Sequence, residues 1–236
     1  DDGNCTYPDN GDYSLSFDGS YYTGGTDKVE IIGLSTSDSI RDFDFDFYVL
    51  DTDTPYGGNI FDSPGDNFVY SCQIINGGDQ FGLRIVLYST SGSYVYFDTD
   101  ISLDFISWHH ANISMSNLGD LVLTVNGEDM SLFPYSGNTS FDSYEFKDNL
   151  RIGTFNGMID DFKLNNQDIL VLDYKFNAGE GTTLYDHSGN GNHGTINGAT
   201  WVENIEGCTH PNATNYDDTA NVDDGSCEYE TVQIGH

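Results

Sequence analysis

The sequence predicts an all-β protein, and three observations lead to that expectation. Residues 170–177 alternate, with Leu172, Tyr174 and Phe176 on one side, which is the period of two that a half-buried strand requires. Residues 41–50, RDFDFDFYVL, alternate aspartate with phenylalanine in the same way. A chain of 236 residues fits one large β-domain with small attachments, and its 37% hydrophobic and 14% aromatic content is enough for a packed core.

The charge balance excludes whole classes of partner. Seven Lys and Arg stand against 39 Asp and Glu, a formal net charge of −32. Nucleic acid is excluded as a partner because its phosphates need a basic surface. No apolar run approaches the length of a membrane span, so we expect no direct membrane insertion, and no signal peptide opens the sequence, so we expect a mature or excised segment. Either an acidic marine or halophilic surface or a calcium-rich one explains the charge.

The cysteines and the glycosylation motifs point to an oxidising, extracytoplasmic setting. The chain has four cysteines and N-x-S/T motifs at Asn4, Asn112, Asn138 and Asn212. In a eukaryotic or viral protein these asparagines are candidate glycan sites. In a bacterial protein the motifs carry no such meaning.

A short motif is repeated near the two ends of the chain. Residues 1–7, DDGNCTY, return as residues 223–229, DDGSCEY, at the end of a longer unit, GCTHPNATNYDDTANVDDGSCEY, at 207–229. This unit resembles a cysteine-framed acidic repeat of large secreted surface proteins of marine microbes. The first copy lacks its front half, so we expect the chain to come from a longer array in which such units alternate with larger domains.

The C-terminal unit, residues 205–230, is here called the staple. Too few residues separate Cys208 from Cys227 to build a core, so we expect a disulfide between them, contributing about 3 kcal/mol by loop closure. Three fates are open for Cys5: a disulfide with Cys72, a bond to another chain, or a free thiol.

Several segments between the acidic units resemble laminin-G-like, concanavalin A-like and pentraxin-like lectin domains. They are YSLSFDGS at 13–20, WHHANISM at 108–115, LVLTVNGE at 121–128, IGTFNGMIDDFKLNN at 152–166 and YKFNAGEGTTLYDHSGNGNHGTINGATW at 174–201. The resemblance implies a two-sheet antiparallel jelly-roll sandwich of about a dozen strands. In many relatives the 174–201 block comes first. Here it comes last, so we expect it to supply the final strands, beside the strand that begins at Tyr13.

The expected organisation therefore has four parts. Residues 1–10 are the tail of a preceding acidic repeat or a linker, 11–204 form the jelly roll, 205–230 form the staple, and 231–236 are a linker or tail.

The resemblance also implies a structural Ca²⁺ in the jelly roll. By position, the ligands to carry over are Asp18, Asp27, Asp160 and Asp161. For the last two, turn capping and strand alternation are the alternative.

In the staple, Asp217, Asp223 and Asp224 supply clustered hard oxygens that suit Ca²⁺. Asx-turns within a disulfide-closed loop explain the same aspartates, and both interpretations stay open.

Catalysis is not expected. The alternation at 41–50 places Asp42, Asp44 and Asp46 on one face, and related glycoside hydrolases use such paired carboxylates about 5 Å apart. All three are Asp rather than Glu, and the context is lectin-like, so a polar strand face is the preferred interpretation. His187 and His193 flank a Gly/Asn-rich loop, but zinc would require a third ligand that the sequence does not provide.

We therefore expect a non-catalytic extracellular module of a repetitive surface protein, on a cell or a virion. Its role would be structural or adhesive, stabilised by Ca²⁺, with glycans or neighbouring subunits as partners. One alternative is a building block that associates end to end into a fibre, sheath or virion surface. A second is a glycoside hydrolase that uses Asp42, Asp44 and Asp46. The sequence does not locate a sugar site.

Overall fold

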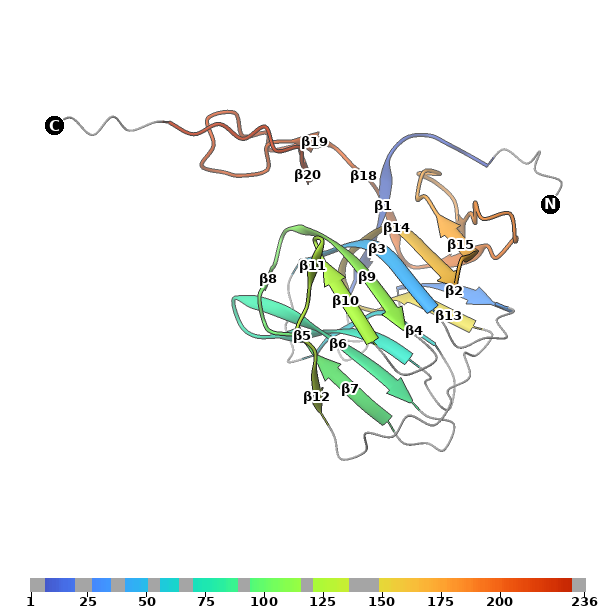
Figure 1. The fold of residues 1–236 in the computed structure, drawn as a ribbon. Coiled ribbons are helices and arrows are strands. Elements are labelled where there is room, and N and C mark those ends of the chain that lie inside the picture. Colours follow the sequence, from blue (N-terminus) through green and yellow to red (C-terminus); the bar gives the residue numbers. More distant parts are fainter. Residues whose placement is uncertain are drawn as a thin grey trace.

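The computed structural model describes residues 7–19, 27–34, 41–50, 56–63, 70–88, 94–115, 121–135 and 149–230. Within these ranges the protein is all-β. Two large antiparallel sheets pack face to face as a jelly-roll sandwich, and a small third sheet lies in the staple, so the predicted fold class is confirmed (Figure 1). Among the described residues, no helix has the length and hydropathy that crossing a membrane would need.

The first sheet has eight strands in the order β11-β10-β9-β3-β14-β1-β18, with β15 also paired to β14. Their bounds are β1 (Tyr13–Asp18), β3 (Arg41–Val49), β9 (Trp108–Met115), β10 (Leu121–Val125), β11 (Glu128–Asp129), β14 (Asn156–Asn166), β15 (Ile169–Tyr174) and β18 (Thr200–Glu203).

The second sheet has ten strands in the order β12-β7-β6-β5-β4-β13-β2-β17-β16, with β8 paired to β6. Their bounds are β2 (Lys28–Ile32), β4 (Tyr56–Asp62), β5 (Tyr70–Asn76), β6 (Gln80–Tyr88), β7 (Tyr94–Asp98), β8 (Leu103–Asp104), β12 (Phe133–Tyr135), β13 (Asn149–Gly153), β16 (Thr183–Leu184) and β17 (Gly194–Asn197).

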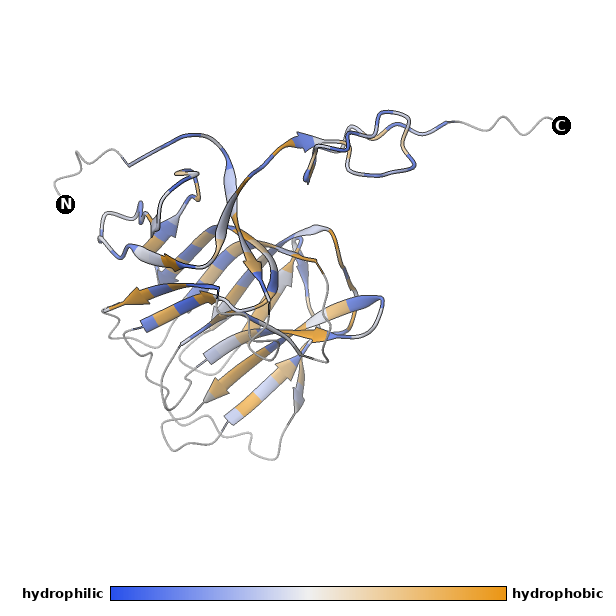
Figure 2. Ribbon diagram, turned by 180° about the vertical axis from the view of Figure 1, so that it is seen from behind, coloured by the Kyte–Doolittle hydropathy of each residue, from blue (hydrophilic) through white to orange (hydrophobic). Residues whose placement is uncertain are grey.

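The core lies between the two sheets and is rich in phenylalanine. The three phenylalanines of β3, Phe43, Phe45 and Phe47, are fully buried, as the alternation at 41–50 predicts. Phe43 stacks on Phe61 of the opposite sheet with ring centroids 4.4 Å apart, and Phe45 stacks on Phe162 of β14. Figure 2 shows hydrophobic and hydrophilic residues alternating along the strands, and in the first sheet β3 and β9 bury one side and leave the other open.

The last segment of the jelly roll closes the sandwich, as the sequence predicts. β15 extends the first sheet, β17 pairs with β2 in the second, and β18 pairs with β1. Tyr13 of β1 lies opposite Glu203 of β18, so the entry and the exit of the jelly roll are neighbours.

The Gly/Asn-rich loop between β16 and β17 is organised by Asp186, which is fully buried. Its carboxylate accepts hydrogen bonds from the backbone N–H groups of Asp173, Ser188 and Asn192 and from the Ser188 hydroxyl, at 2.8–3.0 Å. A carboxylate with this many donors fixes the loop relative to β15.

The staple contains the predicted disulfide. Cys208 and Cys227 are bonded with their Cα atoms 4.9 Å apart. Two short strands, β19 (Glu206–Gly207) and β20 (Val222–Asp223), pair in parallel beside it. Figure 1 shows the staple extending away from the sandwich beyond β18.

Of the three alternatives for Cys5, the disulfide with Cys72 is contradicted by the structure. Cys72 lies on β5, is fully buried in the core and forms no disulfide. Burial raises the pKa of its thiol, so it stays protonated and unreactive at neutral pH. Cys5 itself, and the two remaining interpretations of it, lie outside the described residues.

The glycosylation motifs differ in accessibility. Asn112 is half-buried on β9, whereas Asn212 is exposed in the staple. Asn4 and Asn138 lie outside the described residues.

Candidate binding cleft

The open face of β3 presents the three aspartates that the sequence singles out. Asp42, Asp44 and Asp46 are each partly exposed on the side opposite the phenylalanines. The neighbouring strand β9 sets His110 directly opposite Asp46 and Asn112 opposite Asp44. The β3–β9 register therefore decides which side chain meets each carboxylate.

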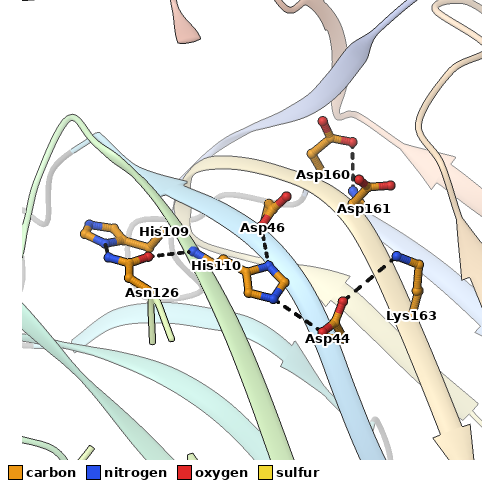
Figure 3. Close-up of polar contacts among 8 residues, drawn as sticks. All are labelled: Asp44, Asp46, His109, His110, Asn126, Asp160, Asp161 and Lys163. Atoms are coloured by element: carbon orange, nitrogen blue, oxygen red, sulfur yellow. Dashed lines mark hydrogen bonds and ion pairs between the residues drawn. The ribbon is translucent and has the colours of Figure 1, made fainter. Parts of the chain in front are cut away.

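His110 joins two of the three carboxylates. Its Nδ1 lies 2.7 Å from Asp46 Oδ1, and its Nε2 lies 3.4 Å from Asp44 Oδ2 (Figure 3). Lys163 Nζ lies 4.0 Å from the other oxygen of Asp44. Burial raises the pKa of Asp46, and the contact with His110 opposes that rise. The His110 imidazole thus lies between the two central carboxylates, and Asp44 also faces the Lys163 ammonium group.

A bulge in β14 brings two further carboxylates to the same face. The pairing with β3 is regular up to Asp160, opposite Asp46, and resumes at Lys163 after a register shift. Asp161 has a positive φ of 46° at this point, and its N–H donates to Asp160 Oδ1 at 2.7 Å. The extra residue lets Asp160 and Asp161 both line the open face instead of alternating across the sheet (Figure 3).

The entry and exit of the jelly roll fold over this pair. Asn204, just after β18, donates its backbone N–H to Asp12 O at 2.9 Å and its side-chain amide to Asp160 Oδ2 at 2.9 Å. Burial raises the pKa of Asp160 to about 8, and the negative charges of Asp161 and Asp12 add to the shift. At neutral pH Asp160 therefore holds its proton in the folded protein.

The remaining wall comes from the start of β9 and the following turn. Asn126, with φ 54°, occupies the Asn-Gly turn after β10, where its Oδ1 accepts from His110 N–H at 3.0 Å and its Nδ2 lies 3.2 Å from His109 Nδ1. His109 is buried, which lowers its pKa, and its Nε2 lies 2.9 Å from Asp104 O. A buried neutral imidazole therefore supports the turn.

The staple provides the last side. Trp108 Nε1 donates to Asn221 O at 3.1 Å. Asn221 Nδ2 also donates to Glu203 O, and Asn221 Oδ1 accepts from Ile205 N–H at 2.7 Å. One asparagine therefore fastens the staple both to β9 and to the end of β18.

Together these groups surround a cleft of about 370 Å³ on the open face of the first sheet. The lining residues are Asp12, Asp46, Trp108, His109, His110, Asn126, Asp160, Asp161, Asn204 and Val222. The cleft is rich in carboxylate and amide groups and has one aromatic wall. Such a surface can accept hydrogen bonds from a ligand that carries hydroxyl or amino groups.

The four predicted Ca²⁺ ligands of the jelly roll form two separate pairs. Asp27 Oδ2 accepts from Asp18 N–H at 3.2 Å. Asp18 lies opposite Asn156, four positions along β14 from Asp160, a distance of about 13 Å in an extended strand. Among the described residues, no group of three or more His, Cys, Asp or Glu side chains is placed to hold a metal ion. Calcium binding at either pair therefore stays a prediction and would require rearrangement or ligands beyond the described side chains.

The staple aspartates cap turns. Asp217 Oδ1 accepts from Thr219 N–H at 2.9 Å and from the Thr219 hydroxyl at 2.7 Å, and these bonds lower its pKa. Asp224 Oδ1 accepts from Ser226 N–H at 2.8 Å, which lowers the pKa of Asp224 as well. Asp223 Oδ1 accepts from Gly225 N–H at 3.3 Å. These are the Asx-turns that the sequence offers as the alternative to calcium, and calcium in the staple stays a prediction.

Sequence reasoning did not name Asp12, Asn126, Asn204 or Val222 as site residues. Asp12 and Asn204 meet only because β1 and β18 pair, and Val222 reaches the cleft only because the staple docks on Trp108. The one available signal was the prediction that the last strands lie beside the first.

Comparisons with known proteins concern the architecture. No protein-family model matches this sequence, and a search of curated proteins gave no match. Among solved structures, the chain is similar to a pentraxin from Limulus polyphemus, with 14% identity, a TM-score of 0.49, and coverage of 67% of this chain and 77% of the pentraxin.

Two other similar structures are much longer than the matched part. Domains LG4-5 of the mouse laminin alpha1 chain match with 13% identity and a TM-score of 0.43 over 66% of this chain and 41% of theirs. The receptor-binding domain of botulinum neurotoxin C/D mosaic serotype matches with 16% identity and a TM-score of 0.44 over 65% of this chain and 42% of its own. The chain thus spans less than half the length of these two structures.

Proposed function

We propose that this chain is a non-catalytic, extracellular adhesive module whose cleft binds a terminal neutral or amino sugar of a glycan. The observation that supports the proposal is the convergence of carboxylates and amides from β3, β9, β14 and the β18 linker on one cleft of about 370 Å³. This volume is at the small end of the range for ligand pockets, so a single sugar unit is the appropriate size.

The polar lining favours a ligand rich in hydroxyl groups. Asp46 and Asp161 provide acceptors, while Trp108 provides a half-buried aromatic surface at the edge. Sugar hydroxyls donate well to carboxylates, and the apolar face of a sugar ring packs on an indole.

Charge decides which sugars qualify. The cleft contains four carboxyl groups, at Asp12, Asp46, Asp160 and Asp161, in a chain with a formal net charge of −32. Sialic, uronic and sulfated sugars would meet strong repulsion, whereas neutral sugars would not and a protonated amino sugar would be attracted.

The arrangement of the carboxyl groups supports binding rather than hydrolysis. Asp44 and Asp46 share one imidazole, as described above. Asp160 has the raised pKa of a general acid, but both of its oxygens accept hydrogen bonds, from Asp161 N–H and from the Asn204 amide. A proton donor to a glycosidic oxygen must face the substrate.

The extracellular location and the Ca²⁺ are part of the proposal. A disulfide in a small acidic unit suits an oxidising compartment. Ca²⁺ would relieve the repulsion among aspartates that lie close together, as at Asp18 with Asp27.

A glycan array probed with the purified chain tests the proposal, in millimolar Ca²⁺ and again with chelator. We expect retention on neutral or amino-sugar glycans and none on their sialylated or sulfated forms. Asp46→Asn, which removes a charged acceptor from the cleft, should weaken binding to the best glycan by roughly tenfold in calorimetry. Asp42→Asn is the matched control, because Asp42 lies on the same face of β3 but outside the cleft lining.

Three results would contradict the proposal. The first is no retention on any glycan in either condition. The second is an equal loss of affinity in the Asp42→Asn control. The third is release of reducing ends from a bound glycan, which would show hydrolysis rather than binding.

A further inference from the structure

The repeated motif ends in a tyrosine whose position in the first copy is described. Residues 1–7 and 223–229 are identical at five of seven positions, and Tyr7 in the first copy corresponds to Tyr229 in the second. The same motif therefore places one tyrosine before the jelly roll and one after it.

Tyr7 is seated on the jelly roll that follows it. Its ring stacks on Tyr185 with centroids 5.0 Å apart and meets His187 and His193 edge-on, at 5.2 and 5.3 Å. We call Tyr185, His187 and His193 the socket. Just after Tyr7, Asn10 donates its N–H to Asn177 O at 2.8 Å and its side-chain amide to Ala178 O at 2.6 Å.

The socket is a rigid part of the fold. His193 Nδ1 accepts from Asp186 N–H at 3.0 Å, and His187 N–H donates to Asp173 O at 2.8 Å. Since Asp186 is itself buried and saturated with donors, the loop that carries the socket and the His193 ring are held by contacts that do not involve Tyr7.

Tyr229 lies near the end of the staple. It is 55% exposed and packs edge-on against His210. The backbone before it is fixed, because Glu228 O accepts from Thr214 N–H at 2.7 Å and Glu228 N–H donates to Asn215 Oδ1 at 2.7 Å. Figure 1 shows the N-terminal stretch beside the loops near β15 and the end of the staple pointing away from the sandwich.

We propose that Tyr229 is a coupling residue that occupies the socket of a second copy of this jelly roll placed directly after the staple. Tyr7 and Tyr229 end two copies of the same motif. The contact of Tyr7 with the socket therefore indicates which surface Tyr229 would bind. Consecutive modules would then meet through an aromatic contact of fixed geometry rather than through a flexible linker. This inference is independent of the sugar cleft, because none of the three socket residues lines it.

A tandem protein tests the inference, with residues 1–229 of one copy joined to residues 8–236 of the second. In it Tyr229 stands where Tyr7 stands in the single chain. A Thr195→Ser marker in the second copy separates the two sockets by mass, because each socket is read on a peptide that spans residues 185–195. Hydrogen exchange of residues 185–193 is then measured at physiological ionic strength, where repulsion between the acidic copies is screened.

We expect the second socket to exchange as slowly as the first. Tyr229→Ala should speed exchange in the second socket alone, by roughly three- to tenfold, the range of an aromatic pair. Tyr7→Ala should produce the same change in the first socket alone, which makes each copy the control for the other.

Two outcomes would overturn the inference. One is an unchanged second socket in the Tyr229→Ala tandem while Tyr7→Ala speeds exchange in the first. The other is no response of the first socket to Tyr7→Ala, since the contact would then stabilise nothing. Because both variants are read inside a tandem with one untouched copy, a folding failure would appear throughout the affected copy rather than at residues 185–193.

Discussion

The pKa of Asp160 in the cleft is set by effects that oppose one another. Hydrogen bonds from Asp161 N–H and Asn204 favour its ionised form, but burial and two neighbouring carboxylates prevail and raise its pKa to about 8. The group is therefore neutral when folded and ionised when unfolded over much of the pH scale.

This shift predicts a pH dependence of stability. Below about pH 4 both states hold the proton. Between about pH 4 and 8 only the folded state holds it, so the free energy of unfolding falls as the pH rises through this window. Asp160→Asn should remove that fall. The free energy of unfolding of the variant, relative to that of the wild type, should therefore be about 1–3 kcal/mol higher at pH 8 than at pH 4, allowing for partial exposure. Urea unfolding across this range measures it.

The control for this experiment is Asp168→Asn, which changes an exposed aspartate in the turn after the same strand. Its pH profile should follow the wild type. Parallel profiles for Asp160→Asn and the wild type would show that Asp160 does not keep its proton in the folded state.

Among the elements, the staple depends most on one bond. It has two strands of two residues each, and Cys208 is its main buried side chain. Its disulfide closes a loop with a sequence separation of 19, which contributes about 3 kcal/mol in the chain-entropy model. A unit of this size has no core to replace that contribution.

Replacing both cysteines, Cys208→Ser with Cys227→Ser, should therefore unfold the staple and leave the jelly roll folded. The two tryptophans report the difference. The Trp108 indole N–H donates to Asn221 in the staple, whereas the Trp201 indole N–H donates to Gly181 within the jelly roll. In proton NMR the Trp108 indole signal should move and exchange faster while that of Trp201 stays. Retention of both signals would mean that the staple folds without its disulfide.

The sequence was sufficient wherever structure follows from local pattern. The Asp/Phe alternation at 41–50 predicted the face of β3, and the spacing of Cys208 and Cys227 predicted the disulfide. The bulge at Asp161 was not predictable in this way, because it depends on the register of β14 against β3.

For the same reason the sequence placed its four Ca²⁺ candidates as one set, whereas the fold separates them along β14. The cleft itself is assembled by contacts between residues far apart in the chain, such as Asp12 with Asn204. No local pattern encodes those contacts.

At the scale of the whole molecule, the antiparallel pairing of β1 with β18 determines how the jelly roll responds to tension. Since Asp12 and Asn204 are side by side, a pull on these two points loads the Asn204 N–H bond to Asp12 O first and the Tyr13–Glu203 pair next. The bonds lie along the pull and open one after another, which is unzipping rather than shear.

The jelly roll should therefore yield at low force, with β18 leaving first while β14 still holds β1. Optical tweezers with handles at residues 12 and 204 measure this, and handles at residues 12 and 156 give a comparison in which β1 is drawn along its pairing with β14, because Asn156 lies opposite Asp18 at the far end of β1. A higher rupture force for the first pair of handles would contradict the expectation. A string of such modules would lengthen under load by releasing one strand at a time, as a shock absorber does.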